Sequence, residues 1–303
     1  MTGTAPKRRE WDFTRLWSLG ASAFALGFML LMVTLFIWQS IPVWKHEGIS
    51  YVTGKSWFFR QQEFGMLPMV YGSVMVAAVA LIIAVPLGLG TAIFTSEFLP
   101  SRVRLVVKLI VELLSGIPSV VYGLLGILFL RNWVYDMLER FEPLNGDTLL
   151  TAGLLLAVMV LPTIMTLADD ALRGVSVNQR LAARGLGLTQ TETIFSIVLP
   201  QAAPGLMSAV LLGLGRALGE TIAVFLVVGR QDNQWPDPIY SMRLLIESGQ
   251  TLTSKLGSSE TNIAYGDPLH WAAMVGLGLI LLLMTAAITW VGIRLGKGKD
   301  GHA

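Results

Sequence analysis

Long apolar stretches alternate with short polar segments along the whole chain. Five stretches contain no Asp, Glu, Lys or Arg, and a sixth contains two charged residues. Each is about as long as the roughly 20 residues that a membrane-spanning helix needs. The pattern predicts six spanning helices, which places both chain termini on one side of a membrane. The predicted spans are 16–44, 64–96, 113–130, 148–168, 203–229 and 270–293.

The polar segments between these spans differ in their content of Lys and Arg. The segments 1–15, 97–112, 169–192 and 294–303 together hold thirteen Lys and Arg residues. The other three segments together hold eight, along with eleven acidic residues. Cytoplasmic segments carry the excess of basic residues, so the distribution predicts cytoplasmic termini. The chain then has a cytoplasmic N-tail at 1–15, a transmembrane domain at 16–296, an outer loop at 230–269 and a cytoplasmic C-tail at 297–303.

Composition agrees with a membrane protein and excludes several functions. Of the 303 residues, 53% are hydrophobic and 14% charged, which is more apolar surface than one soluble core could bury. The net charge of +2 does not argue for a nucleic-acid partner. Cysteine is absent, which excludes disulfides and thiolate metal sites. The histidines His46, His270 and His302 are far apart in the sequence, so no metal site is expected.

Two charged residues lie inside an otherwise uncharged span. Within 203–229 only Arg216 and Glu220 ionise, and a charge in lipid costs about 2.5–3.5 kcal/mol on insertion scales. Their spacing would put both on one face of a continuous helix. We expect them to line an anion path in which the guanidinium holds oxyanion oxygens and the carboxylate neutralises it when the path is empty. A salt bridge that only holds helices together is the alternative.

The segment 169–200 between the fourth and fifth spans predicts two short helices. Ser176-Val-Asn-Gln179 and Thr189-Gln-Thr-Glu192 both fit the capping-box pattern of a helix start. Gly187 is expected to separate the helices and Pro200 to end the second. Adjacent alanines in the first helix would form a small-residue surface that a partner could approach, although an amphipathic helix on the membrane surface also fits the pattern.

This loop resembles the EAA loop of ABC-importer permeases. The family pattern is Glu-Ala-Ala, three residues, Gly, nine residues, Ile, one residue and Leu-Pro, and the spacing here matches throughout. In that family the loop forms the coupling helix that docks onto an ATPase subunit. Leu181 stands where the family has Glu, which leaves docking by shape but removes the acidic side chain. The matching residues are Leu181, Ala182, Ala183, Gly187, Ile197, Leu199 and Pro200.

Three further segments are similar to the phosphate importer permeases, and closest to the PstC type of subunit. They are 64–73, 116–123 and 213–221, the last of which contains Arg216 and Glu220. The resemblance implies an all-helical permease of the ABC type I importer class, in the bacterial inner membrane, that moves inorganic phosphate by alternating access. It also implies a PstA-like second permease, two PstB-like ATPase subunits that bind ATP and Mg²⁺, and a PstS-like periplasmic phosphate-binding protein.

Two other functions stay open at this point. A permease for another oxyanion, such as sulfate or molybdate, would share the fold, and an ion-coupled carrier or channel could use Glu220 for protons without an ATPase. The chain has no ATP site of its own, since 48–56 only approximates a phosphate loop. Asp169 and Asp170 are expected to face solvent rather than to act in catalysis. We therefore expect a transport subunit that is not an enzyme and binds no cofactor directly.

Overall fold

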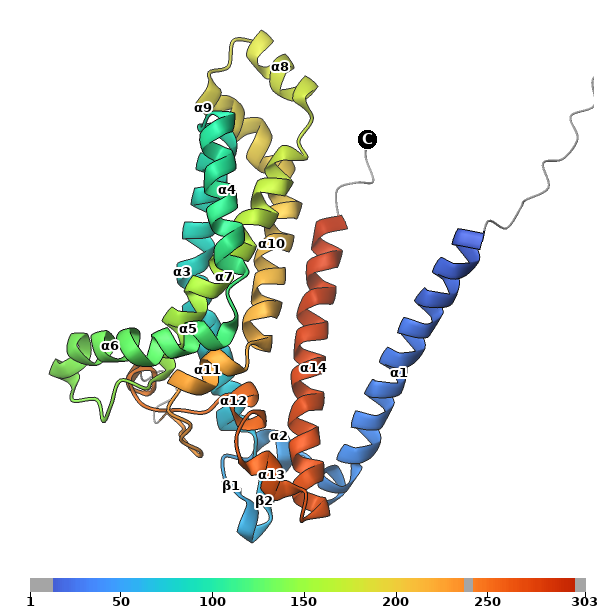
Figure 1. The fold of residues 1–303 in the computed structure, drawn as a ribbon, viewed down its shortest axis with the longest axis vertical. Helices are drawn as coiled ribbons and strands as arrows, with labels where there is room; N and C mark the ends of the chain where they lie inside the picture. Colours follow the sequence, from blue (N-terminus) through green and yellow to red (C-terminus); the bar gives the residue numbers. More distant parts are fainter. Residues whose placement is uncertain (1–12, 237–241, 298–303) are drawn as a thin grey trace, which may run out of the picture.

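The computed structural model describes residues 13–236 and 242–297, and this part of the chain is almost entirely helical (Figure 1). The predicted tails 1–15 and 297–303, and with them His302, lie almost wholly outside the described residues. Two short strands, β1 (Trp57–Phe58) and β2 (Glu63–Phe64), pair in antiparallel fashion.

The helices of the described residues follow in chain order. They are α1 (Phe13–Glu47), α2 (Ser50–Thr53), η1 (Phe59–Gln61), α3 (Leu67–Glu97), α4 (Ser101–Ser115), α5 (Ser119–Leu125), η2 (Gly126–Leu130), α6 (Arg131–Leu138), η3 (Glu139–Phe141), α7 (Leu149–Arg173), α8 (Val177–Gly185), α9 (Gln190–Thr193), η4 (Ile194–Val198), α10 (Leu199–Gly219), α11 (Ile222–Val227), η5 (Met242–Ile246), α12 (Leu252–Leu256), α13 (Glu260–Ala264) and α14 (Pro268–Lys297). Both η2 and η4 are π-helical turns.

Five predicted spans correspond to the long helices α1, α3, α7, α10 and α14. Within the described residues these five regions are long and apolar enough to cross a membrane. The predicted span 113–130 is not one continuous helix, because the chain bends by 86° between α4 and the helix that starts at Ser119. Pro118 disfavours helical geometry at the residue before it, so an unbroken apolar run does not give an unbroken helix. A sixth crossing exists if this bent pair counts as one span.

The centre of the molecule is formed by α3 and α7, with α10 packed against them. Glycines permit the close approach of these helices. Gly88 of α3 and Gly213 of α10 both face Ile164 of α7, and a β-carbon added at Gly213 would lie 2.7 Å from Ile164 Cγ1. Lipid is as apolar as these side chains, so helices in a membrane associate through such close packing. Ile164 is completely buried at this junction.

The two ends of the helix bundle carry different structures (Figure 1). At one end α8 and α9 connect α7 to α10, and the first turn of α1 and the last turn of α14 point to this same end. At the opposite end lie α2, β1, β2, α12 and α13, which we call the cap. Helix α1 packs against α14 and leans away from the other helices, and none of its most apolar stretch is buried.

Candidate functional site

Arg216 lies in the last turn of α10, where the partial negative charge of a helix end favours a cation. Its Nη1 donates a 2.7 Å hydrogen bond to Oγ1 of Thr163 on α7. The residue is exposed, and among the described residues no carboxylate lies within ion-pair distance of it. Thr163 therefore orients the guanidinium while other N–H groups are left to bind an acceptor.

Glu220 follows the end of α10 and is not helical, with φ −70° and ψ 121°. Its Oε1 accepts a 3.3 Å hydrogen bond from the backbone N–H of Ala223, in the first turn of α11. A carboxylate that satisfies an N–H group of a new helix competes with continuation of the old one. The predicted continuous helix 203–229 is therefore wrong, and so is the shared helix face that it implied for Arg216 and Glu220.

Glu220 lines a small cavity at the junction between α10 and α11. The other polar groups of this cavity are Ser73 on α3 and Thr251 and Thr253 at the start of α12, all of which are buried residues. Ser73 Oγ accepts a 2.9 Å hydrogen bond from the backbone N–H of Leu252. The helix break thus lies where the cap meets α3, so a movement of the cap would act directly on the surroundings of Glu220.

The loop between α7 and α10 contains the two predicted short helices, and Gly187 separates them. The end of α8 is a Schellman motif, in which the N–H of Leu188 bonds to the carbonyl of Ala183 at 3.2 Å and the N–H of Gly187 to that of Arg184 at 3.0 Å. Gly187 has a φ of +89°, a conformation in which a β-carbon would be strained. The sequence indicated this position correctly.

The two predicted capping boxes differ in the structure. Both reciprocal bonds exist between Thr189 and Glu192, and the N–H of Thr189, followed by its hydroxyl, lowers the pKa of that carboxyl. The box predicted at Ser176 is wrong, because its hydroxyl makes no cap bond and α8 is held by Arg180 instead. Pro200 does not end the second helix. It lies at the start of α10, directly after the π-helical turn η4, within a helical stretch that runs unbroken from Gln190 to Gly219.

The residues that match the EAA pattern are divided between the surface and the interior. Leu181 is 58% exposed and Ala182 is also exposed, whereas Ala183 is only 4% exposed. The expected surface of paired alanines is therefore wrong, since successive residues of a helix point in different directions. Of the remaining matches, Pro200 is exposed and two residues are half-buried, Ile197 and Leu199.

An ion pair that the sequence did not indicate fixes this loop to α3. Arg180 Nη1 donates to both carboxylate oxygens of Glu97, at 2.8 and 2.6 Å, and Nη2 donates to the carbonyl of Leu172 at 2.7 Å. The amide of Gln190 donates to the carbonyl of Glu97, also at 2.7 Å. The partners are 83 residues apart, a separation for which no helical or strand periodicity gives a signal.

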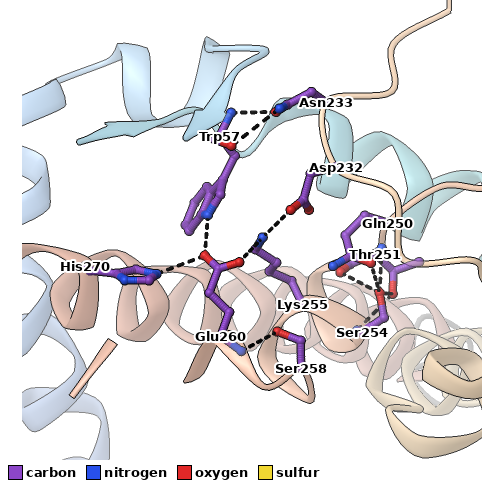
Figure 2. A network of polar contacts seen from close by, with 10 residues as sticks. All are labelled: Trp57, Asp232, Asn233, Gln250, Thr251, Ser254, Lys255, Ser258, Glu260 and His270. Carbon is purple, nitrogen blue, oxygen red and sulfur yellow. Dashed lines mark hydrogen bonds and ion pairs between the residues drawn. The ribbon is translucent and has the colours of Figure 1, made fainter. Parts of the chain in front are cut away.

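A second unpredicted network lies in the cap, where the ammonium of Lys255 forms ion pairs with Asp232 and Glu260 (Figure 2). Lys255 is 1% exposed. Glu260 also accepts hydrogen bonds from Trp57 Nε1 at 2.7 Å and contacts His270 Nε2 at 2.9 Å. The network joins β1, α12, α13 and α14. His270 therefore belongs to this network, and the described residues contain no group of His, Asp and Glu side chains suited to a metal.

Burial and pairing shift the pKa values of Asp232 and Glu260, the two acids of this network, in opposite directions. Burial raises the pKa of Asp232, and the charge of Lys255 offsets only part of that effect. Burial would also raise the pKa of Glu260, but the hydrogen bond and charge of Lys255, with the bonds from Trp57 and His270, outweigh it and lower the pKa. Glu260 is thus held as the charged partner of Lys255.

Of the two adjacent acids at the end of α7, Asp170 faces solvent as expected and Asp169 does not. Asp170 is largely exposed, with a long contact of 3.8 Å to Lys108. Asp169 does not face solvent, because it is 4% exposed and its carboxylate pairs with Arg173 at 2.9 Å. Arg173 lies one turn later on the same helix, which explains how the buried charge is compensated.

Comparison with known proteins adds the family. The model of the family described as "Binding-protein-dependent transport system inner membrane component" matches residues 84–297. A protein of Mesorhizobium japonicum named "Phosphate transport system permease protein PstC" is 35% identical over 267 residues, which cover 83% of this chain and 78% of that protein. "Phosphate transport system permease protein PstC 1" of Mycobacterium tuberculosis is 38% identical over 240 residues, covering 73% and 69% of the two chains.

Solved structures show the same fold at lower identity. The crystal structure of a bacterial alginate ABC transporter, in complex with an alginate pentasaccharide-bound periplasmic protein, contains a chain with a TM-score of 0.61. The match is 14% identical and covers 96% of this chain and 98% of that chain. It shows that the arrangement of helices described above is that of an ABC importer permease.

Proposed function

This chain belongs to the binding-protein-dependent transport system inner membrane components, and within them to the PstC permeases, and from this we infer that it is the permease subunit of a phosphate ABC importer. The observation that carries the conclusion is the 35% identity to a PstC protein over 83% of this chain. The five or six regions able to cross a membrane agree with it. The chain is a transport subunit and not an enzyme.

We propose that Arg216 binds phosphate during passage. A guanidinium keeps its charge and offers a planar fork of donors that fits two oxygens of an oxyanion. The bond to Thr163 leaves part of this fork available, which supports the assignment. Because Arg216 lies at the end of α10, phosphate bound there would also feel the opposing partial charge of the helix end, which favours release as well as binding.

Glu220 is assigned the role of a competing carboxylate. It follows the break between α10 and α11, so rotation about this junction changes its separation from Arg216 without unfolding either helix. When the path is empty, Glu220 moves toward the guanidinium and neutralises it. When phosphate enters, repulsion between the two anions returns Glu220 to its bond with the N–H of Ala223.

The partners follow from the same assignment. We propose that the chain pairs with a PstA-like permease, that two PstB-like ATPase subunits bind ATP and Mg²⁺, and that a PstS-like protein delivers phosphate to the cap. The exposed surface of α8, which includes Leu181, is the proposed contact with an ATPase subunit. Closure of the ATPase pair then drives alternating access. The cap and α8 lie at opposite ends of the molecule, as this scheme requires (Figure 1).

The test is uptake of radiolabelled phosphate by the complete complex in proteoliposomes. We expect uptake that requires the ATPase subunits and ATP, and that excess unlabelled phosphate suppresses. Equal suppression by sulfate or molybdate would favour a permease for another oxyanion. Uptake that persists without the ATPase subunits would favour an ion-coupled carrier or channel, and either result would overturn this assignment.

A further inference from the structure

We propose that the ion pair between Glu97 and Arg180 is the positioning contact that transmits movement of α8 into α3 and α7. The inference rests on the proposed function and adds the route by which α8 acts on the helices of the transport path. It concerns two residues that neither touch phosphate nor form the exposed surface of α8.

The geometry of Arg180 links three elements through one side chain. Its guanidinium binds both carboxylate oxygens of Glu97, the last residue of α3, and also the carbonyl of Leu172 near the end of α7. The side chains are 21% exposed for Arg180 and 7% exposed for Glu97. Nη1 contacts the carboxylate of Glu97 and Nη2 contacts the carbonyl of Leu172, so one planar guanidinium ties α8 to the ends of both α3 and α7.

Apart from this ion pair, α8 has few buried contacts with the bundle, so the ion pair is its main attachment. Ala183 is the one buried residue of α8, whereas Leu181 is 58% exposed and Leu186 is 82% exposed. The neighbouring α9 is attached to the same point, since Gln190 donates to the carbonyl of Glu97. A force on α8 therefore reaches the bundle at the end of α3, whereas α9 also continues through η4 into α10.

From the ends of α3 and α7, a continuous chain of contacts leads to Arg216, the residue proposed to bind phosphate. Leu172 and Thr163 lie on the same helix, α7, and Thr163 holds Arg216. Helices α3 and α7 pack along their length, so Arg180 pulls on both members of one rigid pair.

The experiment compares phosphate imported per ATP hydrolysed by complete complexes that contain E97Q, R180Q or the exchanged pair E97R/R180E. Arg102→Gln is the matched control, because Arg102 is an exposed arginine near the same end of the molecule. Removing one member of a buried pair leaves the other uncompensated, so we expect each single variant to lower the ratio about tenfold or more. The exchanged pair should restore most of the phosphate imported per ATP hydrolysed, and the Arg102→Gln control should give the wild-type ratio.

An unchanged ratio in both single variants overturns the proposal, and so does an exchanged pair whose defect is the sum of the single defects. If the single variants do not assemble, Arg180→Lys decides the question. Lysine keeps the charge but has a single nitrogen in place of the two that bind Glu97 and Leu172. We therefore expect the phosphate-to-ATP ratio to fall while assembly is retained, and an unchanged ratio overturns the proposal.

A second readout does not depend on which ion is transported. The chain has no cysteine, so spin labels can be placed on cysteines at Arg184 of α8 and Ser101 at the start of α4. We expect the label-to-label distance to stay narrow and equal with and without ATP, and to broaden when R180Q is added. Equal distributions with and without R180Q contradict the transmission role, whereas absence of phosphate uptake by the wild-type complex contradicts the proposed function instead.

Discussion

At the scale of single residues, the site depends on how one guanidinium is oriented. The sequence singled out Arg216 and Glu220 as candidates because charges are rare in apolar spans, and this signal comes from the cost of burying charge. It could not identify Thr163, because a threonine in a helix commonly bonds to its own backbone and gives no signal of a partner 53 residues away. A similar limit applies to Lys255, because its ion pair with Asp232, 23 residues earlier, follows no helical or strand periodicity.

Arg216 and Thr163 give a graded prediction for transport. Arg216→Gln removes the charge, and we expect phosphate uptake to fall by about 100-fold or more, equivalent to roughly 3 kcal/mol or more. Arg216→Lys keeps the charge but loses the fork, with an expected fall of about tenfold. Thr163→Val removes one orienting bond and should reduce uptake about three- to tenfold. Initial rates in proteoliposomes measure these effects, and normal uptake by Arg216→Gln would remove Arg216 from the path.

Lys255 predicts a large effect on stability. Lys255→Met leaves Asp232 and Glu260 without their shared cation, and breaking such a buried network costs about 3–5 kcal/mol. Thermal unfolding of the purified complex should show a clearly lower midpoint. Lys45→Met is the matched control, since Lys45 is exposed at the end of α1 and should change stability by no more than about 0.5 kcal/mol. Equal midpoints for the two variants would contradict a structural role of the network.

Glu260 predicts a dependence of stability on pH. Its pKa is lower in the folded protein than the usual 4.5, so its contribution is complete above pH 4.5 and is lost as the pH falls through the lowered pKa. The difference in melting temperature between wild type and Glu260→Gln should therefore be constant near neutral pH and shrink below pH 4.5. A melting-temperature difference that grows as the pH falls would contradict a lowered pKa of Glu260 in the folded protein.

At the scale of elements, apolar length predicts where helices exist but not where they break. The run 113–130 contains a proline that bends the chain, and 203–229 is divided because the Glu220 carboxylate binds the start of a new helix. Both breaks depend on local hydrogen bonds and sterics that hydropathy does not measure. Among the cap and turn features of the loop between α7 and α10, only those at Gly187 and Thr189 were predicted correctly, because both act through their nearest neighbours in sequence.

The packing of α10 against α7 gives a prediction with a control in the same motif. A β-carbon at Gly213 would meet Ile164 at 2.7 Å, whereas one at Gly215 would find only an ordinary contact of 3.6 Å with Thr289. Gly213→Ala should push α10 from α7, separate Arg216 from Thr163 and lower phosphate uptake, and Gly215→Ala should leave it near wild type. Adding Ile164→Ala should restore part of the uptake, and failure of Gly213→Ala to reduce it would show that the helices adjust freely.

At the scale of the whole molecule, the chain is a bundle with two distinct ends (Figure 1). The sequence predicted five of the long helices and their order, since each is encoded by its own apolar run. It did not predict the cap, whose short elements are joined by contacts such as that between Trp57 and Glu260, 203 residues apart. The basic residues concentrated near α8 and in the tails support a cytoplasmic location for that end of the molecule.

This orientation can be tested with single cysteines, because the chain has none of its own. Ser56→Cys lies in the cap and Arg184→Cys on α8, and both positions are exposed. Moving basic segments across a membrane is unfavourable, so the α8 end should remain inside. A membrane-impermeant maleimide should label Ser56→Cys in intact spheroplasts and Arg184→Cys only in inverted vesicles. The unaltered chain, which should take up no label, is the control, and the reverse pattern would place α8 where no ATPase in the cytoplasm could reach it.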